Sequence, residues 1–266
     1  MTLHHAKINW KTVAQAAVIL IAAVSLKTFY STASVNGLTW MLWPTKMIVE
    51  LISDTRFHFE SYAGYMSEDR SFLIAAACSG VNFLIAIFLM LSLRTLWQRR
   101  GDSTSWRSLL LIAGLSYIIT IIANSLRISS ALWLISTRRE FFGLDRDEMH
   151  RLDGVLIYFG MMLLVYLAFE YWEKKGQVLR WQKLVFPLAV YYAITLALPI
   201  VNGAFRDSEF LTHSLFVFVT PLALIGMFVL LGKLLFRDAQ YERVAAAAPL
   251  FPRDLSANEI CPGPNI

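Results

Sequence analysis

The sequence predicts an all-α integral membrane protein with about six transmembrane helices and one further interfacial or re-entrant helix. Hydrophobic residues make up 57% of the 266 residues and charged residues only 16%, whereas apolar residues make up roughly half of an ordinary globular protein. The apolar residues gather in runs long enough to cross a hydrocarbon layer of about 30 Å. Lys and Arg are concentrated in alternate connections between these runs, which is typical of a multi-pass membrane protein.

Six apolar runs reach the length of a membrane crossing. They are residues 13–30, 72–93, 109–135, 152–172, 184–204 and 210–236. The first run also has features of a secretory signal, because Lys7 and Lys11 precede it and small residues follow it. Its length favours an uncleaved first span, from which the Lys27 side chain extends toward the interface.

Residues 38–52 form a shorter apolar segment, which we expect to lie at the membrane interface or to be re-entrant. Lys46, Glu50 and Pro44 would be unfavourable in the middle of a bilayer, and the apolar residues recur at helical spacing. Trp40 and Trp43 suit the headgroup region, where amphipathic rings settle. A plain seventh span is the alternative interpretation.

The basic residues indicate the orientation of the chain. The connections at 94–107 and 174–183 and the two ends are rich in Lys and Arg, so we expect them on the cytoplasmic side of the inner membrane and the other connections on the periplasmic or extracellular side. The connection at 138–151 is an exception, because it carries four Arg residues on the outer side. Loop bias accounts for the net charge of +5, and without a soluble basic domain we expect no nucleic-acid binding.

The domain organisation is expected to be simple. Residues 1–236 form one polytopic membrane domain, and the tail at 245–266, with four prolines, is predicted to be disordered. The two cysteines, Cys78 and Cys261, are expected on opposite sides of the membrane. A disulfide between them is therefore not expected.

The tripeptide Cys78-Ser79-Gly80 is the most informative motif in the chain. If the second span begins near Ser71, Cys78 lies two turns below its outer end, and a helix N-terminus or a nearby cation stabilises a thiolate. Asn82 would share a helix face with Cys78, and Gly80 allows another backbone to approach closely. A free cysteine in a membrane is more often a small apolar residue, so this motif alone leaves both interpretations open.

Arg127 lies in the outer half of the third span, where an arginine requires a partner, a cavity or the interface. Asn124 precedes it by three residues and shares its helix face. The ordinary interpretation is an arginine that extends outward to the interface. The functional interpretation is a cation that stabilises the Cys78 thiolate or the oxyanion of a tetrahedral intermediate.

His150 precedes the fourth apolar run, and Gly154 and Tyr158 follow on the same helix face. An imidazole titrates near neutrality and suits general acid or base chemistry. A single loop histidine often has no such role. His213 in the last span and His58 in the first outer connection compete for it.

These motifs together resemble the exosortase/archaeosortase family, and most of all its exosortase K branch. Members carry a Cys-Ser-Gly or Cys-Ala-Gly segment, an Arg that follows Asn in a later span, and a His that opens another. The matching segments are 77–83 (Ala-Cys-Ser-Gly-Val-Asn-Phe), 124–127 (Asn-Ser-Leu-Arg) and 150–154 (His-Arg-Leu-Asp-Gly). An interfacial stretch at 44–51 and a turn at Gly64-Tyr65 are also similar. The resemblance covers about 10–172, so the spans at 184–204 and 210–236 extend beyond this core.

The resemblance implies a membrane-embedded cysteine protease or transpeptidase that needs no metal or organic cofactor. Its substrates would be proteins with a C-terminal sorting signal, consisting of a Pro-Glu-Pro-like motif (PEP-CTERM), a transmembrane helix and a basic cluster. Cys78 would attack the scissile carbonyl to give a thioester, His150 would transfer protons, and Arg127 would stabilise charge. The acceptor nucleophile is unknown, with a lipid and an envelope glycan as candidates. Ser79, Gly80, Asn82, Asn124 and Gly154 would support the site.

Other functions remain open at this point. A small-solute transporter would use Arg127, Lys46, Glu50 and His213 along a pathway, but these residues lie near the outer boundary and no paired broken helices repeat along the chain. A non-catalytic scaffold for export of an envelope polymer would use the polar face only for docking. A serine hydrolase based on Ser79 lacks the Gly-x-Ser-x-Gly turn.

Overall fold

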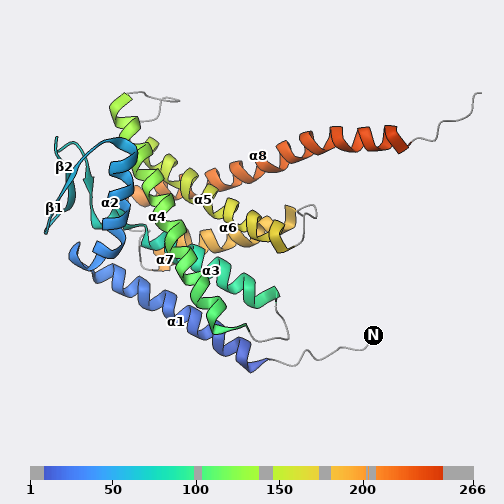
Figure 1. The fold of residues 1–266 in the computed structure, drawn as a ribbon, viewed down its shortest axis with the longest axis horizontal. Coiled ribbons are helices and arrows are strands. Elements are labelled where there is room, and N and C mark those ends of the chain that lie inside the picture. The colour runs from blue at the N-terminus through green and yellow to red at the C-terminus, as the bar shows by residue number, and fades with distance from the viewer. Residues whose placement is uncertain are drawn as a thin grey trace, which may run out of the picture. The chain divides into compact units, whose positions relative to one another are not determined.

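Long apolar helices form most of the chain, as predicted. The computed structural model describes residues 9–98, 104–137, 146–173, 181–201, 203 and 208–247. Within these residues, five stretches are long and apolar enough to cross a membrane, namely Trp10–Thr32, Ala76–Gln98, Trp106–Thr137, Glu148–Glu173 and Phe210–Leu231. The helices that form them are α1 (Trp10–Thr32), α3 (Val81–Gln98), α4 (Trp106–Thr137), α5 (Arg146–Glu173) and α8 (Ser208–Ala247) (Figure 1).

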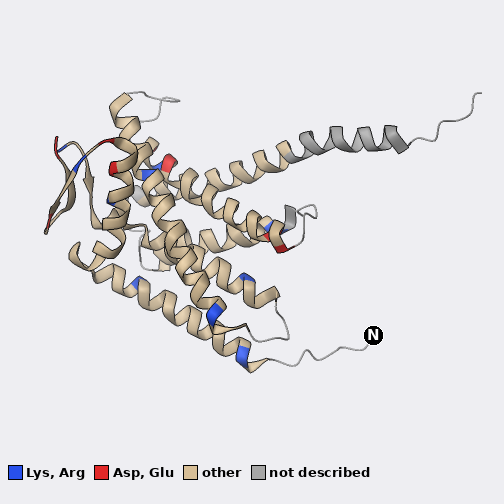
Figure 2. Cartoon of the chain, viewed as in Figure 1, with Lys and Arg blue, Asp and Glu red and all other residues tan. Residues whose placement is uncertain are grey.

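The chain divides into two units, residues 1–225 and 226–266, and all contacts described below lie in the first. There α3 is the central helix and is packed against α1, α4, α5 and α6 (Val185–Tyr192). Twelve of its residues are buried. This agrees with the sequence of α3, which is apolar on nearly all sides and not on one face only. Figure 2 shows few charged residues along these helices and more near their ends and on the strands.

The fifth predicted span, at 184–204, is shorter than expected. A 3₁₀ turn (Trp181–Leu184, η3) leads into α6, which continues through a π-helical segment (Ala193–Ala197, η4) into α7 (Leu198–Val201). The continuous apolar helix Val185–Val201 is about 25 Å long at 1.5 Å per residue. Pro199 lacks the N–H that would bond to the Thr195 carbonyl, which accounts for the wider π turn before it. Residues 202 and 204 lie outside the described residues.

The segment predicted to be interfacial or re-entrant forms α2 (Thr39–Ser53), after a 3₁₀ turn (Asn36–Leu38, η1). Its 15 residues are too few for a span, in agreement with the sequence. Pro44 leaves the Trp40 carbonyl without its helical donor, and the Tyr117 hydroxyl of α4 donates to that carbonyl at 2.7 Å. The ring of Tyr117 also stacks on the Trp40 ring, with centroids 5.8 Å apart. A proline in α2 is therefore compensated by a specific contact with α4.

Lys46 and Glu50 form an ion pair with each other in α2, at 2.7 Å. The Glu50 carboxylate also accepts a hydrogen bond from the Phe57 N–H at 2.8 Å. Burial favours the neutral acid, but the Lys46 ammonium and the Phe57 N–H hold the pKa of Glu50 below its usual value. Lys46 thus neutralises Glu50, and Glu50 connects α2 to the backbone at Phe57.

A small antiparallel sheet follows α2, and the sequence analysis did not predict it. Strands β1 (Phe57–Glu60), β2 (Gly64–Ser67) and β3 (Leu73–Ile74) pair in the order β1-β2-β3 and lie beside α2 in Figure 1. The resemblance predicted a turn at Gly64 and Tyr65. In the structure these two residues instead begin strand β2. Gly64 has φ +133°, and a Cβ there would collide with the Ile74 carbonyl. Such short strands give too little alternation to be recognised in a sequence.

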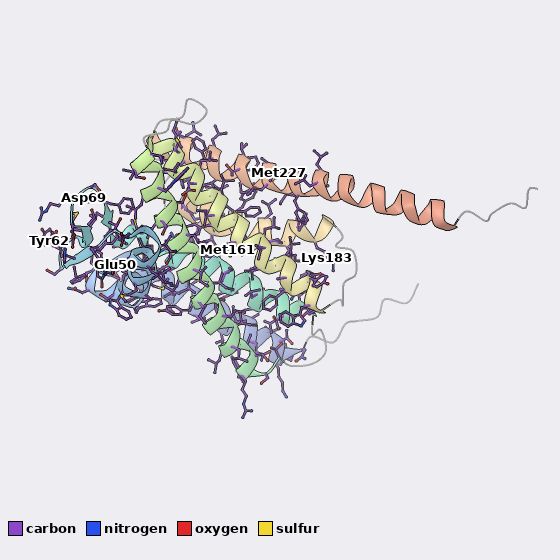
Figure 3. The ribbon with its side chains drawn as sticks, turned by 45° about the horizontal axis from the view of Figure 1, so that its top comes forward. Glu50, Tyr62, Asp69, Met161, Lys183 and Met227 are labelled. Carbon is purple, nitrogen blue, oxygen red and sulfur yellow. The ribbon has the colours of Figure 1, made fainter. Side chains whose placement is uncertain are left out.

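Buried ion pairs join α3, α5 and η3 at the other end of this unit. Arg94, expected in a loop, is a buried residue of α3 with 4% of its side chain exposed, and it bonds to Glu170 and Glu173 of α5 at 3.0 and 2.8 Å. Lys183 reaches the second Glu170 oxygen at 2.7 Å. Figure 3 shows Lys183 at this end and Glu50, Tyr62 and Asp69 at the other. With Arg94 inside α3, the second span continues past its predicted end at residue 93 and reaches Gln98.

Candidate active site

Cys78 lies in a 3₁₀ turn (Ala76–Ser79, η2) immediately before α3. The prediction that it lies two turns into a helix starting near Ser71 is wrong. The start of the apolar run is used by β3, whose Leu73 and Ile74 pair with β2. Gly80 then adopts φ +74°, and the first α-helical hydrogen bond runs from the Leu84 N–H to the Gly80 carbonyl. Cys78 is therefore next to the positive N-terminal end of α3 rather than within the helix.

Asn82 is in the first turn of α3, on the other side of the left-handed Gly80 from Cys78. The expected i to i+4 relation between Cys78 and Asn82 on one helix face is consequently wrong. Asn82 instead lines a cavity described below, and its Oδ1 accepts a hydrogen bond from the Lys27 Nζ of α1 at 2.8 Å.

Asn124 fixes the backbone of the cysteine turn. Its Nδ2 donates to the Cys78 carbonyl at 2.6 Å, and its Oδ1 accepts from the Tyr158 hydroxyl at 2.7 Å. The side chain is fully buried, so both amide atoms need these partners. A Cβ on Gly80 would lie 3.2–3.3 Å from Asn124 and Thr120, which explains why a glycine stands at this position.

Arg127 is one turn after Asn124 on the same face of α4, as predicted. Its guanidinium lies close enough to the Cys78 and Tyr158 side chains to interact with both electrostatically. The guanidinium carbon lies 5.4 Å from the centroid of the Tyr158 ring, and Nε is buried with no hydrogen-bond partner. Arg127 therefore points inward to the cysteine and not outward to the interface.

Gly154 of α5 lies against the arginine. A Cβ at Gly154 would lie 3.5 Å from the Arg127 Cδ. The neighbouring Asp153 accepts a hydrogen bond from the Ser130 hydroxyl at 2.8 Å and interacts electrostatically with Arg127. Gly154 and Asp153 thus lie on the part of α5 that is next to Arg127.

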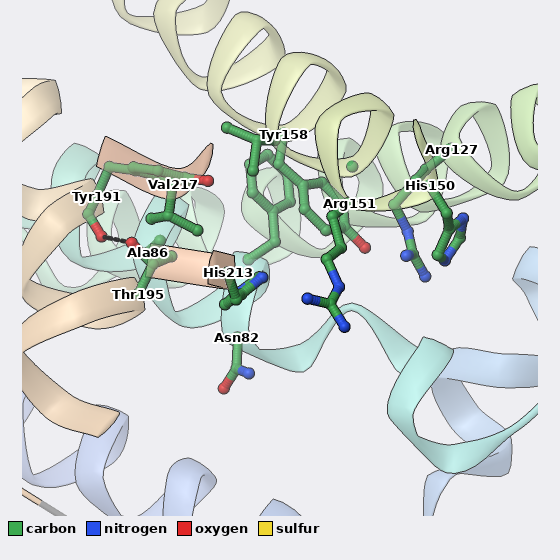
Figure 4. Close-up of a pocket in the computed structure, with 13 residues that line it drawn as sticks. Asn82, Ala86, Arg127, His150, Arg151, Tyr158, Tyr191, Thr195, His213 and Val217 are labelled. Atoms are coloured by element: carbon green, nitrogen blue, oxygen red, sulfur yellow. Dashed lines mark hydrogen bonds between the residues drawn. The ribbon is translucent and has the colours of Figure 1, made fainter. Parts of the chain in front are cut away.

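A cavity of about 290 Å³ lies beside this cluster. His150, Gly154 and Tyr158 all line it, as expected from their spacing along α5, and Figure 4 shows the His150 ring next to the Arg127 guanidinium. The full lining consists of Asn82, Phe83, Ala86, Arg127, His150, Arg151, Gly154, Val155, Tyr158, Tyr191, Thr195, His213 and Val217. The structure thus joins Cys78 to Arg127 directly and His150 to Arg127 through their common cavity.

The two competing histidines differ in position. His213 of α8 lines the same cavity as His150. His58 belongs to β1, is largely exposed and pairs with Glu68 at 3.3 Å. His213 consequently remains a neighbour of the site, whereas His58 belongs to the sheet.

Sequence reasoning missed two residues of α1. Lys27, expected to extend to the interface, bonds to Asn82 instead. Tyr30 interacts electrostatically with Cys78 and Arg127 and lies near the Ser79 hydroxyl, which is fully buried and has no partner in hydrogen-bond geometry. The only sequence signal was a lysine followed three residues later by a tyrosine in an apolar span.

The site offers a nucleophile, a cation and an imidazole. Across the described ranges, no three His, Cys, Asp or Glu side chains lie close enough together to hold a metal ion. A thiol beside a guanidinium and a helix N-terminus is the environment in which cysteine acts as a nucleophile. The His150 imidazole, on the cavity that Arg127 also lines, is suited to proton transfer.

Comparison with known proteins identifies the family of the chain. No curated protein and no solved structure matches the chain significantly. One family model, described as transmembrane exosortase (Exosortase_EpsH), matches residues 10–167, which is more than half of the chain and includes Cys78, Arg127 and His150. The chain is a multi-pass membrane protein that belongs to the transmembrane exosortase family.

Proposed function

We propose that the protein is a cysteine transpeptidase of the membrane, most similar to the exosortase K branch, with Cys78, Arg127 and His150 as its catalytic residues. The observation that carries the proposal is the contact of the Arg127 guanidinium with Cys78, beside a cavity that also contains His150. A buried arginine is unfavourable in an apolar helix unless it serves a partner. A thiolate, or an oxyanion formed next to it, is a partner of the required charge.

The reaction that these groups support has two halves. The Cys78 thiolate attacks the scissile carbonyl, and the resulting oxyanion is stabilised by Arg127. The carbon–nitrogen bond breaks, His150 donates a proton to the leaving amine, and a thioester remains on Cys78. An acceptor nucleophile then attacks the thioester, His150 removes its proton, and the Cys78 thiolate is released.

The substrates are proteins with a C-terminal sorting signal, made of a PEP-CTERM-like motif, a transmembrane helix and a basic cluster. After cleavage the protein passes to an acceptor, for which a lipid and an envelope glycan are the candidates. The distribution of Lys and Arg supports a site on the outer side of the inner membrane with both ends of the chain in the cytoplasm.

The test is co-expression with a substrate that carries such a signal. Processing is compared in the wild type, Cys78→Ala, Cys78→Ser and Ser79→Ala, with membrane insertion of each variant checked by fractionation. We expect processing to stop in both Cys78 variants and to continue in Ser79→Ala, because the Ser79 hydroxyl is fully buried. A thioester trapped on Cys78 and released by hydroxylamine would identify the intermediate.

The same experiment separates this function from the two alternatives. Normal processing by an inserted Cys78→Ala protein would reject the enzyme and favour a scaffold. Solute uptake that is lost in Arg127→Gln and retained in Cys78→Ala would favour a transporter.

A further inference from the structure

Lys27 of α1 is an intramembrane cation with an unusual set of partners. Its Nζ donates to the Asn82 Oδ1 at 2.8 Å and lies 5.3 Å from the centroid of the Tyr30 ring. Among the described residues it forms no ion pair with a carboxylate. A lysine in an apolar span is retained at a free-energy cost, and here its ammonium is directed at a neutral amide of another helix.

The bond to Lys27 fixes how the Asn82 amide is turned. An ammonium has three donors and no acceptor, whereas a carboxamide has an accepting oxygen and a donating NH₂ group. The bond to Lys27 therefore turns Oδ1 toward α1 and leaves Nδ2 on the opposite side. In the described part of the chain, the Asn82 side chain makes no other hydrogen bond. Figure 4 shows the Asn82 side chain apart from His213 and Arg151, with its amide directed away from them.

We propose that Lys27 is a positioning residue, which orients the Asn82 amide so that its NH₂ group donates to a backbone carbonyl of the bound peptide. The proposal deepens the function proposed above and rests on it. The geometry places this donor four residues after Cys78 and on the same cavity as Arg127 and His150. Without Lys27 the amide is free to rotate, and its oxygen would then repel the carbonyl it is meant to bind.

The experiment measures processing of a purified substrate by the full-length protein in detergent, with kcat and KM determined separately. The variants are Lys27→Met, Lys27→Arg, Asn82→Leu, Asn82→Asp and the double variant Lys27→Met/Asn82→Leu. Asn82→Asp retains an acceptor for Lys27 and has no donor. Thr28→Val is the matched control, because the Thr28 hydroxyl bonds only to the Val24 carbonyl of its own helix. Alkylation of Cys78 by iodoacetamide is measured in every variant.

We expect kcat/KM to fall by about tenfold in Lys27→Met and by at least as much in both Asn82 variants, the size of one lost charge-assisted or transition-state hydrogen bond. Lys27→Arg should restore most of the loss, since it still donates. Because Lys27 acts through Asn82, adding Lys27→Met to Asn82→Leu should cause no further loss. The rate of Cys78 alkylation should not change. A general disturbance of the fold would instead alter this rate.

Four results would overturn the proposal: normal kinetics in Lys27→Met, additive effects in the double variant, full activity in Asn82→Asp, or slower Cys78 alkylation in Lys27→Met. Cys78→Ala is included to distinguish failure of the proposed function from failure of the role of Lys27. Processing by Cys78→Ala would reject the proposed function itself. Loss of processing in Cys78→Ala together with normal kinetics in Lys27→Met would reject only the role of Lys27.

Discussion

In the proposed function, Arg127 is the residue on which the reactivity of Cys78 depends. Its guanidinium lies near the Cys78 side chain and the Tyr158 ring, and its Cδ lies next to Gly154. A guanidinium offers several donors in a fixed plane, whereas an ammonium is a single point of charge. A lysine at this position would keep the charge but would lose the planar set of donors that faces both Cys78 and Tyr158.

We therefore expect Arg127→Gln to lower kcat by about 100-fold, the typical effect of removing one group that stabilises an oxyanion. Arg127→Lys should give an intermediate loss. Alkylation of Cys78 near neutral pH should also slow in Arg127→Gln, because the cation that favours the thiolate is gone. Arg107, in the first turn of α4, provides the matched control, and Arg107→Gln should leave both rates unchanged. Equal alkylation rates in wild type and Arg127→Gln would contradict this role.

Gly80 is the second residue for which the structure makes a specific prediction. Gly80→Ala adds a Cβ at φ +74°, only 3.2–3.3 Å from Asn124 and Thr120, so we expect a loss of about 1–2 kcal/mol of unfolding free energy and weaker processing. Gly160→Ala in α5 is the control, because nothing lies within 4 Å of its Cβ. Denaturant titration in detergent checks both. A Gly80→Ala protein as stable as Gly160→Ala would contradict the strained turn.

At the scale of elements, the sheet between α2 and η2 sets where α3 begins. Pairing of β3 with β2 takes up the start of the apolar run, and the chain then needs η2 and Gly80 before α3 can start. Asp69 closes the turn between β2 and β3, accepting from the Ser71 N–H at 3.1 Å and from its hydroxyl at 2.7 Å. Hydrogen bonds from the Ser67 and Ser71 hydroxyls and the Ser71 N–H lower the pKa of Asp69 to about 2.

This pKa predicts acid sensitivity of the β2–β3 turn. A carboxylate whose pKa is depressed in the folded state stabilises it above the unfolded value near pH 3.8, and that contribution is lost as the pH falls toward 2. Protection of the Ser71 and Phe72 amides from hydrogen exchange should therefore decrease between pH 4 and 2. In Asp69→Asn the protection should be lower at pH 4 and nearly independent of pH. A wild-type protein with constant protection across this range would contradict the prediction.

At the scale of the whole molecule, polar groups hold both ends of the first unit. One end has the Tyr117 contact with α2 and the Asn124 contact with the cysteine turn. The other end has Arg94 and Glu170, which are 4% and 5% exposed. In a membrane the apolar faces of helices gain little by leaving lipid for each other, so interhelical polar contacts specify the packing.

We expect Glu170→Gln to destabilise the protein by about 3–5 kcal/mol, because it leaves Arg94 buried without its main partner. Glu173→Gln is the matched control. The Glu173 side chain is 47% exposed although it also contacts Arg94, so its loss should cost about 0–1 kcal/mol. Unfolding in detergent measures both. Equal destabilisation by the two variants would show that burial of the Arg94–Glu170 pair does not matter.

The sequence by itself determined the class of the fold and the candidate residues. Apolar runs of about 20 residues have to become helices in a bilayer, because every backbone polar group must be bonded within the segment, and α1, α3, α4, α5 and α8 follow from this. The helical period also predicted correctly that Asn124 and Arg127 share a face and that His150, Gly154 and Tyr158 share another. Such relations depend only on local geometry.

Only the tertiary structure decided how these faces meet. Cys78 precedes α3 because strand pairing, a long-range interaction, competes with helix formation over residues 73–74. Lys27 bonds to Asn82, and Arg94 is buried against Glu170, because α1 and α5 are packed against α3. A polar residue in an apolar run must find a partner, but hydropathy and spacing do not say which helix provides it. That choice is made by packing.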